Sequence, residues 1–280
     1  MRRILLLGID GLLGSTLLVQ LRGDKNFNLV TTARKIQADF QFTYSPRALG
    51  TLLHETQPNI VINCIASTSN EVGLRKSLIV NSLLPIQLAH LSSKHNFSVI
   101  HFSTNAVFSG RNQRNTERTL PIPKTRYGIT KLIGDLSFYR NLIIRTSFVG
   151  VSPNPEVRSG LVEKLRNTPI NGHIPILDNS SWNGITSCAL AEITCAIIRE
   201  IHVPSGIFHI GSSNITTRRE LIETILALLE RNDVTTSATN HNPVSNLALE
   251  TNKIGCISNW WSNTKYVDTP NSMTLISDAI

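Results

Sequence analysis

Short apolar runs alternate along the first half of the chain with longer segments in which apolar residues recur every three or four positions. Short apolar runs are typical of strands buried on both faces, whereas the longer pattern is typical of helices packed on one side. The pattern predicts strands at residues 3–7, 28–33, 59–66, 99–104 and 142–147. It predicts helices at residues 15–21, 46–56, 78–95 and from about 127. This alternation predicts an α/β fold with a doubly wound parallel sheet.

The second half of the chain has a less regular pattern. It predicts helices at residues 189–201 and 217–231. Glu220 follows Thr217 at the spacing of a capping box, which marks the start of the second helix. Residues 232–246 are polar and rich in turn-forming residues, which indicates a surface loop. The pair Trp260 and Trp261 is expected to anchor the tail rather than to bind a ligand.

Composition and charge exclude several classes of protein. With 280 residues, 41% of them hydrophobic, the chain is long enough for one large domain or two unequal ones. No stretch reaches the roughly 18 unbroken apolar residues that a membrane span requires. The net charge of +8 includes a basic cluster at residues 111–126, but no aromatic residues alternate with it to stack on bases. We therefore expect neither membrane nor nucleic acid as a partner, and we expect the basic residues to suit small molecules that carry phosphate.

The spacing of the cysteines predicts neither a metal site nor a redox site. Cys64, Cys188, Cys195 and Cys256 are scattered without metal or redox spacing. We expect them to be reduced core residues of a cytoplasmic protein. No cluster of histidine, cysteine and aspartate suggests a metal site, so none is expected.

A glycine-rich stretch follows directly on the first predicted strand and precedes a predicted helix. Gly8, Gly11 and Gly14 are spaced three apart. Glycines at such a place permit a tight turn and a close approach of the backbone to a pyrophosphate, which the helix N-terminus stabilises. The stretch predicts a dinucleotide site formed by Gly8, Asp10, Gly11, Leu12, Leu13 and Gly14.

The second predicted strand ends in Arg34 and Lys35, and no acidic residue occurs between positions 24 and 39. In folds of this type a carboxylate at that point binds the adenosine ribose, whereas a guanidinium accommodates a 2′-phosphate. We therefore expect NADP(H) as the preferred cofactor, with NAD(H) possible. Residues 1–150 are expected to form a Rossmann-type NADP-binding domain. Residues 151–280 are expected to form mainly a smaller substrate-binding subdomain, with 185–211 returning to the sheet.

Four side chains suited to proton transfer occur between positions 103 and 131. The strand predicted at 99–104 ends on Ser103 and Thr104, as a buried strand that delivers polar groups to a sheet edge would. Tyr127 and Lys131 are four residues apart and therefore lie on one face of a helix. A phenol, an ammonium and a hydroxyl that converge can polarise a carbonyl and protonate it. Because a free phenol has a pKa of about 10, we expect Lys131 to lower the pKa of Tyr127.

These motifs occur in a fixed order that resembles a known family. After the glycine loop come residues 63–66, 80–81, Ser103-Thr104, Tyr127-x-x-x-Lys131, 145–147, 206–211 and 245–253. Together they resemble the dTDP-4-dehydrorhamnose reductase family of extended short-chain dehydrogenases over nearly the whole chain. The resemblance implies that Tyr127 donates a proton to the substrate C4 oxygen and that Lys131 binds the nicotinamide ribose. It implies that Thr104 orients the carbonyl oxygen, with Ser103 beside it. Further cofactor contacts implied are Cys64, Ile65, Ala66 and Asn81.

The substrate implied by the resemblance is a nucleotide-diphosphate sugar. Residues 151–185 are expected to form a lid over it. The side chains expected to contact it are Thr68, Thr104, Asn105, Ala106, Tyr127, Phe148, Arg158 and Trp182. The family usually has Asp-Tyr where this chain has Asn105-Ala106, a change that we expect to reshape the sugar pocket. Ser15, Thr16 and Leu17 replace acidic residues that some members use in a metal-mediated dimer, so a homodimer is possible but its form is open.

Three functions remain open. The leading prediction is the NADPH-dependent reduction of the C4 keto group of a nucleotide-linked 4-keto-6-deoxy sugar, which would supply an activated deoxysugar for a polysaccharide. The second is a sugar-nucleotide epimerase with tightly bound NAD. A dehydratase is disfavoured because dehydratases of this superfamily place an Asp-Glu pair after the active threonine, where this chain has Asn105-Ala106. The third is a non-catalytic NAD(P)-binding regulatory subunit.

Overall fold

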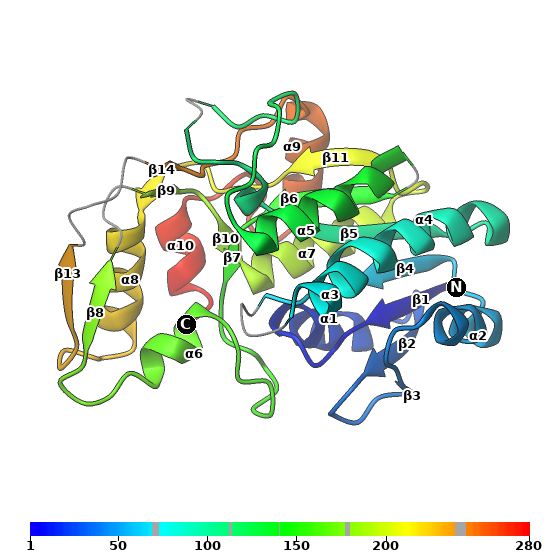
Figure 1. Ribbon diagram of the computed structural model, residues 1–280, viewed down its shortest axis with the longest axis horizontal. Coiled ribbons are helices and arrows are strands. Elements are labelled where there is room, and N and C mark those ends of the chain that lie inside the picture. The colour runs from blue at the N-terminus through cyan, green and yellow to red at the C-terminus, as the bar shows by residue number, and fades with distance from the viewer. Residues whose placement is uncertain (69–72, 112–113, 140, 177–179, 239–244) are drawn as a thin grey trace.

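The computed structural model describes residues 1–68, 73–111, 114–139, 141–176, 180–238 and 245–280 (Figure 1). Its centre is a seven-stranded sheet in the order β11-β6-β5-β4-β1-β2-β3, and every pair of neighbouring strands is parallel. The strands are β1 (Arg2–Leu7), β2 (Phe27–Ala33), β3 (Phe40–Gln41), β4 (Ile60–Asn63), β5 (Ser98–Thr104), β6 (Leu142–Thr146) and β11 (Gly206–His209). The predicted doubly wound parallel sheet is confirmed.

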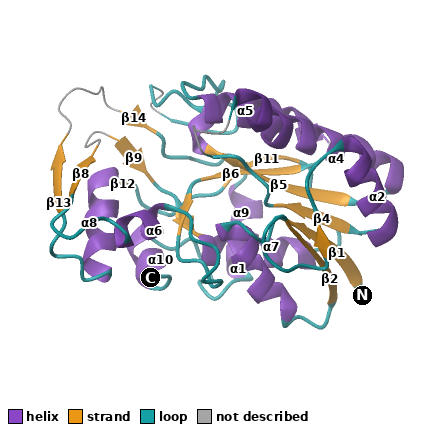
Figure 2. Cartoon of the chain, turned by 60° about the horizontal axis from the view of Figure 1, so that its bottom comes forward, coloured by secondary structure: helices purple, strands orange, loops and turns teal. Residues whose placement is uncertain are grey.

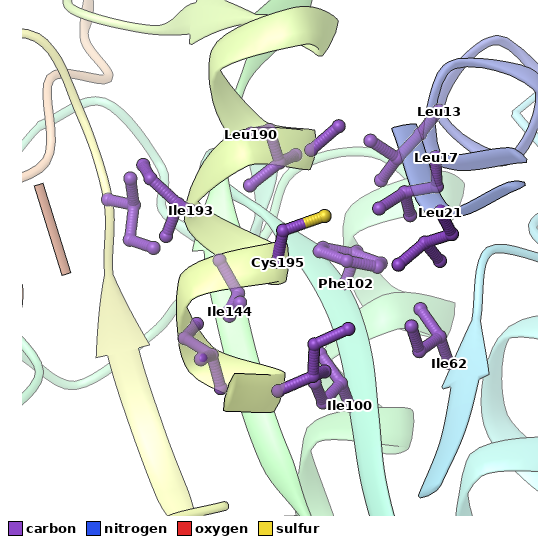
Figure 3. Close-up of a cluster of buried hydrophobic side chains, with 14 of the residues drawn as sticks. Leu13, Leu17, Leu21, Ile62, Ile100, Phe102, Ile144, Leu190, Ile193 and Cys195 are labelled. Atoms are coloured by element: carbon purple, nitrogen blue, oxygen red, sulfur yellow. The ribbon is translucent and has the colours of Figure 1, made fainter. Parts of the chain in front are cut away.

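Successive residues of the buried strands serve opposite faces of the sheet. Ile4 and Leu6 of β1 belong to one apolar cluster, and Leu5 and Leu7 belong to another. The first cluster packs beneath α1 (Leu12–Arg22), α7 (Ser187–Arg199) and α9 (Ile254–Ser262). Figure 3 shows leucines of α1 and residues of α7 converging on the strand residues Ile62, Ile100, Phe102 and Ile144. The second cluster packs beneath α2 (Pro46–Thr56) and α4 (Leu84–His95).

Two predicted elements of the first half differ from those observed. β4 ends at Asn63 rather than at residue 66, because the Asn63 side chain accepts a hydrogen bond from the backbone N–H of Ile65 and turns the chain. The helix predicted from 78 begins earlier, as α3 (Leu74–Leu78), and passes through a π-helical turn, η1 (Ile79–Leu83), before α4. Asn81 lies in this turn. Such turns are frequent at functional sites.

A second group of elements lies at the opposite end of the molecule from the N-terminus (Figures 1 and 2). Its helices are α6 (Leu161–Arg166), α8 (Arg218–Leu228) and α10 (Ser272–Ser277). Its strands form two small sheets: β8 (His173–Ile176) with β13 (Thr235–Ala238), and β9 (Ser180–Trp182) with β12 (Thr216–Thr217) and β14 (Ser245–Asn246). The pair β7 (Phe148–Val149) and β10 (Ile185–Thr186) lies between this group and the main sheet (Figure 1). An apolar cluster around Trp182, Leu221 and Ile225 holds this group together.

The prediction of a loop at 232–246 is wrong where β13 and β14 form, and its residues 239–244 lie outside the described part of the chain. Thr235 and Ser237 form a strand because β8 pairs with them and because His173 hydrogen-bonds to both hydroxyls. The Thr217–Glu220 capping box at the start of α8 is confirmed.

The C-terminal part also returns to the main sheet. β11 pairs with β6 at the sheet edge, and Trp260 and Trp261 of α9 are buried in the core beneath it, so their predicted anchoring role is confirmed. All four cysteines are free, but Cys256 is exposed, which contradicts its predicted place in the core. Within the described ranges, no helix is both long enough and apolar enough to cross a membrane.

Candidate active site

The register of the parallel strands brings the predicted groups to one edge of the sheet. Leu7, the last residue of β1, pairs with Asn63 of β4, and Asn63 pairs with His101 of β5. Thr104, the last residue of β5, pairs with Thr146 of β6. The glycine loop after β1 and the hydroxyls at the end of β5 therefore belong to the same carboxyl edge. In open α/β sheets this edge is where ligands bind.

The glycine loop has the geometry that a pyrophosphate site requires. A Cβ atom on Gly14 would lie 2.1 Å from the carbonyl oxygen of Gly8, so only glycine permits α1 to pack this closely on the loop. Gly11, the N-cap of α1, makes no side-chain capping hydrogen bond, and the first turn contains no acidic residue. A helix N-terminus whose first turn carries no carboxylate favours an anion. The loop therefore fits the diphosphate of a nicotinamide dinucleotide.

Two charged residues lie beside this loop. The Asp10 carboxylate accepts a hydrogen bond of 3.1 Å from the backbone N–H of Arg34, which follows β2. The Arg34 guanidinium is 63% exposed, with its Nε 3.9 Å from Asp10. Lys35 is also exposed. The end of β2 thus presents cationic groups to solvent next to the glycine loop.

Helix α5 (Arg126–Asp135) holds Tyr127 and Lys131. Thr125 caps its N-terminus by accepting a hydrogen bond of 3.0 Å from the backbone N–H of Gly128. A Cβ atom on Gly128 would lie 2.2 Å from the carbonyl oxygen of Ala106. The first turn of α5 therefore packs directly on the short 3₁₀ turn η2 (Asn105–Val107) that follows β5. This contact brings Tyr127 to the end of the strand that carries Thr104.

Tyr127 is held in its protonated form. Burial raises the pKa of its phenol to about 12, and a hydrogen bond with the side chain of Thr104 opposes that rise only in part. The Thr104 hydroxyl also accepts a hydrogen bond of 3.1 Å from the backbone N–H of Ala106. The expectation that Lys131 lowers the pKa of Tyr127 is wrong, because desolvation of the phenol raises this pKa and Lys131 is not among the groups that oppose the rise.

Lys131 is buried and engaged elsewhere. Its amine donates a hydrogen bond of 2.6 Å to the carbonyl oxygen of Phe102 and lies 3.0 Å from Nε2 of His101. Burial lowers the pKa of Lys131 to about 8, opposed by the charges of Asp135 and Cys64. Tyr127 and Lys131 lie on one side of α5, as predicted. The amine of Lys131 is bound by Phe102 and His101 of β5.

A buried ion pair lies beneath Lys131. The Asp135 carboxylate accepts a hydrogen bond of 2.8 Å from Nε of Arg145, and both side chains are 3% exposed. Burial raises the pKa of Asp135, and the charge of Arg145 together with the Ser103 hydroxyl opposes this rise. Ser103 thus faces the ion pair inside the protein, whereas Thr104 faces the phenol.

The expected cofactor residues beyond the glycine loop lie after β4 and in η1. Cys64 and Ile65 directly follow Asn63, and burial raises the pKa of the Cys64 thiol. Asn81 accepts a hydrogen bond from the backbone N–H of Ser67 and donates to the Ser67 carbonyl oxygen and to the Thr130 hydroxyl. Asn81 thereby ties the segment containing Ala66 and Thr68 to helix α5.

The expected substrate residues occupy different environments. Asn105 donates a hydrogen bond of 3.1 Å to the carbonyl oxygen of Leu247, so it joins the site to the chain after β14. Phe148 is half-buried in β7. Arg158 lines a cleft of about 260 Å³ in the 150–167 segment, and Tyr127 is not among the residues that line it. Trp182 is buried, and its indole N–H donates to the Ser147 hydroxyl at 2.9 Å, so Trp182 packs inside the protein rather than presenting an open stacking face.

The sequence analysis missed three buried polar residues around Lys131: Asn63, His101 and Asp135. Asn63 enters the sequence analysis only as the first residue of the 63–66 motif. His101 interrupts the apolar run that forms β5, and a polar side chain within a strand buried on both faces requires a partner. That interruption was the available signal.

Comparisons with known proteins agree with this architecture. A family model described as the RmlD substrate binding domain matches residues 1–252. The dTDP-4-keto-6-deoxy-D-glucose reductase of Streptomyces niveus is 29% identical over 238 residues, which cover 81% of this chain and 78% of that protein. The methionine adenosyltransferase 2 subunit beta of Mus musculus is 27% identical over 145 residues, which cover 50% of this chain and 43% of that protein. The solved dTDP-4-dehydrorhamnose reductase of Bacillus anthracis, in complex with NADP, has the same fold, with a TM-score of 0.81 at 16% identity over 99% of this chain and 98% of that one.

Proposed function

Because the chain belongs to the family of the RmlD substrate binding domain, we propose that it reduces the C4 keto group of a nucleotide-linked 4-keto-6-deoxy sugar with NADPH. The chain is an oxidoreductase of the short-chain dehydrogenase/reductase type that uses a nicotinamide dinucleotide. The observation that carries the proposal is the placement of Tyr127 beside Thr104, whose side chain is its hydrogen-bond partner, at the sheet edge that also carries the glycine loop. A reductase requires a loaded proton donor at that place.

A bound dinucleotide supplies the hydride, and the residues of the chain supply the proton and the alignment. With a pKa of about 12 the phenol keeps its proton throughout the neutral range and is a weaker acid than a free phenol, so the proton moves only as the reduced carbonyl oxygen gains charge and becomes the stronger base. Thr104 hydrogen-bonds to the phenol and aligns it. We assign Lys131 to the ribose hydroxyls on the nicotinamide side, and the uncapped N-terminus of α1 to the diphosphate.

The preference for NADPH rests on Arg34. Its guanidinium is exposed at the end of β2 beside the glycine loop, where a 2′-phosphate would be matched by a charge of opposite sign. Asp10 lies close to Arg34, but its carboxylate accepts the backbone N–H of Arg34, which leaves the guanidinium open to solvent. We further propose that the protein acts in the cytoplasm on nucleotide-diphosphate sugars.

The test is a panel assay on the purified chain. Each of several nucleotide-linked 4-keto-6-deoxy sugars, carrying dTDP, UDP, GDP or CDP, is incubated with NADPH, and oxidation of NADPH is followed by absorbance. Consumption of NADPH that depends on one of these sugars is the expected result. NAD that stays bound after desalting, together with interconversion of sugar epimers and no net oxidation, would identify an epimerase instead.

A non-catalytic role is the second candidate. It is favoured by the likeness of half of this chain to a protein named as a subunit of methionine adenosyltransferase. Under that function the chain binds the dinucleotide but oxidises none of it with any sugar of the panel. The complete set Thr104, Tyr127 and Lys131 at one sheet edge favours the reductase.

A further inference from the structure

Three buried polar side chains form a line from β4 through β5 to α5. Asn63 Nδ2 lies 3.1 Å from Nδ1 of His101, and Nε2 of His101 lies 3.0 Å from the amine of Lys131. The three residues are at most 1% exposed. Asn63 and His101 have no part in the reaction described above. His101 nevertheless contacts Lys131 directly, and Asn63 contacts His101.

The direction of each hydrogen bond along this line follows from the orientation of the Asn63 amide. The backbone N–H of Ile65 can only donate, and it lies 3.1 Å from Oδ1 of Asn63. Oδ1 is therefore the acceptor, and the NH₂ group of Asn63 points at Nδ1 of His101. Nδ1 must then accept, so a neutral imidazole carries its single proton on Nε2. That N–H points at the amine of Lys131.

We propose that His101, with its tautomer fixed by Asn63, is a positioning residue that holds the amine of Lys131 in its uncharged, proton-accepting form. An ammonium has three N–H groups and no lone pair, so it cannot accept the Nε2–H bond. An uncharged amine accepts that bond and still donates one hydrogen to the carbonyl oxygen of Phe102. The opposite tautomer would set two N–H donors of Asn63 and His101 against each other.

The surroundings of the amine weaken its charge but do not by themselves remove it at neutral pH, so the hydrogen-bond geometry carries the proposal. Cys64 after β4, Asp135 on α5 and His101 on β5 are titratable groups that act on it, and Arg145 of β6 already pairs with Asp135. Burial lowers the pKa of Lys131 to about 8 and keeps the pKa of His101 well below its usual value. The N–H of His101 opposes protonation of the amine further, because it competes with the ammonium for the same space.

The role that this inference gives to Lys131 in turnover rests on the proposed function. An uncharged amine accepts a hydrogen bond as well as donating hydrogen bonds, which bears on how Lys131 would hold the ribose hydroxyls assigned to it. The amine acquires a charge only when it leaves His101 or when the ring changes tautomer. His101 would thus set the pH at which the amine changes its charge during turnover.

The first test observes the wild-type protein and uses a variant only to assign one signal. Long-range nitrogen–proton correlation NMR on the ligand-free full chain, labelled at its eight histidines, shows which ring nitrogen of His101 is protonated. A His101→Gln spectrum assigns the signal. The expected result is a neutral ring with its proton on Nε2 at neutral pH. A proton on Nδ1, or a charged imidazolium, overturns the proposal.

The second test measures the amine itself. Carbon NMR of labelled lysine side chains, with Lys131→Met for assignment, follows the titration of Lys131 in the wild type and in Asn63→Leu. Asn63→Leu removes the fixed donor without adding charge, and the pKa of Lys131 should then rise by about one unit or more, a tenfold change in basicity. An unchanged pKa overturns the proposal. Should Asn63→Leu fail to fold, the tautomer in the wild-type spectrum still decides the matter.

Both measurements are made without a sugar, so they are independent of the substrate assignment. If no sugar of the panel supports turnover while His101 shows the Nε2–H tautomer, the proposed function fails and the inference about Lys131 stands. If turnover is found but the tautomer is Nδ1–H, the reverse holds. With a working substrate, Asn63→Leu should also move the pH profile of kcat in the direction in which it moves the pKa of Lys131.

Discussion

Breaking the ion pair between Asp135 and Arg145 should destabilise the protein far more than breaking an exposed pair of equal length. Asp135→Asn leaves the Arg145 guanidinium, whose side chain is 3% exposed, without its counter-charge. The loss of one partner of a buried pair costs about 3–5 kcal/mol. Asp24 and Arg199 offer the matched control, since their N···O distance is also 2.8 Å but Arg199 is 53% exposed. Asp24→Asn should cost at most about 1 kcal/mol.

The assay is urea unfolding at neutral pH, followed by the fluorescence of the three tryptophans. The free energies of unfolding of Asp135→Asn and Asp24→Asn are compared with that of the wild type. A double variant, Asp135→Leu with Arg145→Met, should recover most of the loss because no buried charge remains. If Asp135→Asn destabilises the protein no more than Asp24→Asn does, burial does not determine the strength of this pair and the reasoning is refuted.

Arg34→Glu should raise the KM for NADPH about ten- to hundredfold and leave that for NADH nearly unchanged, because a charge-assisted hydrogen bond is lost; equal effects on both cofactors would contradict the placement of the 2′-phosphate. Gly14→Ala, whose Cβ would lie 2.1 Å from the oxygen of Gly8, should abolish NADPH binding in a fluorescence titration. Gly50→Ala, with open space around its Cβ, should keep binding and add about 0.5–1 kcal/mol of stability. Glu117 accepts three hydrogen bonds that outweigh burial and lower its pKa, so its stabilisation is present above its unfolded pKa and is lost as the pH falls through the folded value. Urea midpoints measured from about pH 5 down to about pH 3 should therefore fall less steeply for Glu117→Gln than for the wild type.

Local sequence signals predicted the elements whose causes are local. The helix at 46–56 has the predicted bounds because Pro46 opens it and Gln57 closes it in a left-handed conformation. The capping box at Thr217 was readable for the same reason. β13 was not predictable, because its polar residues become a strand only by pairing with β8, about 60 residues earlier in the chain.

The site shows the same division. The spacing of Tyr127 and Lys131 predicted that both lie on one side of α5, because four residues are about one helical turn. It could not predict that the amine bonds to His101 and Phe102, since those contacts depend on how α5 packs on β5. For the same reason the direction of the pKa shift of Tyr127 was predicted wrongly. Burial, which follows from packing, raises this pKa, and spacing alone does not reveal burial.

The central claim is that Tyr127 gives the proton in a sugar-dependent reduction. It is tested most directly by comparing Tyr127→Phe with Tyr139→Phe, whose side chain is 60% exposed, in the rate of sugar-dependent NADPH oxidation. The account predicts that Tyr127→Phe lowers kcat by at least about a hundredfold while NADPH still binds, and that Tyr139→Phe leaves kcat unchanged. A Tyr127→Phe protein that oxidises NADPH at the wild-type rate would contradict it.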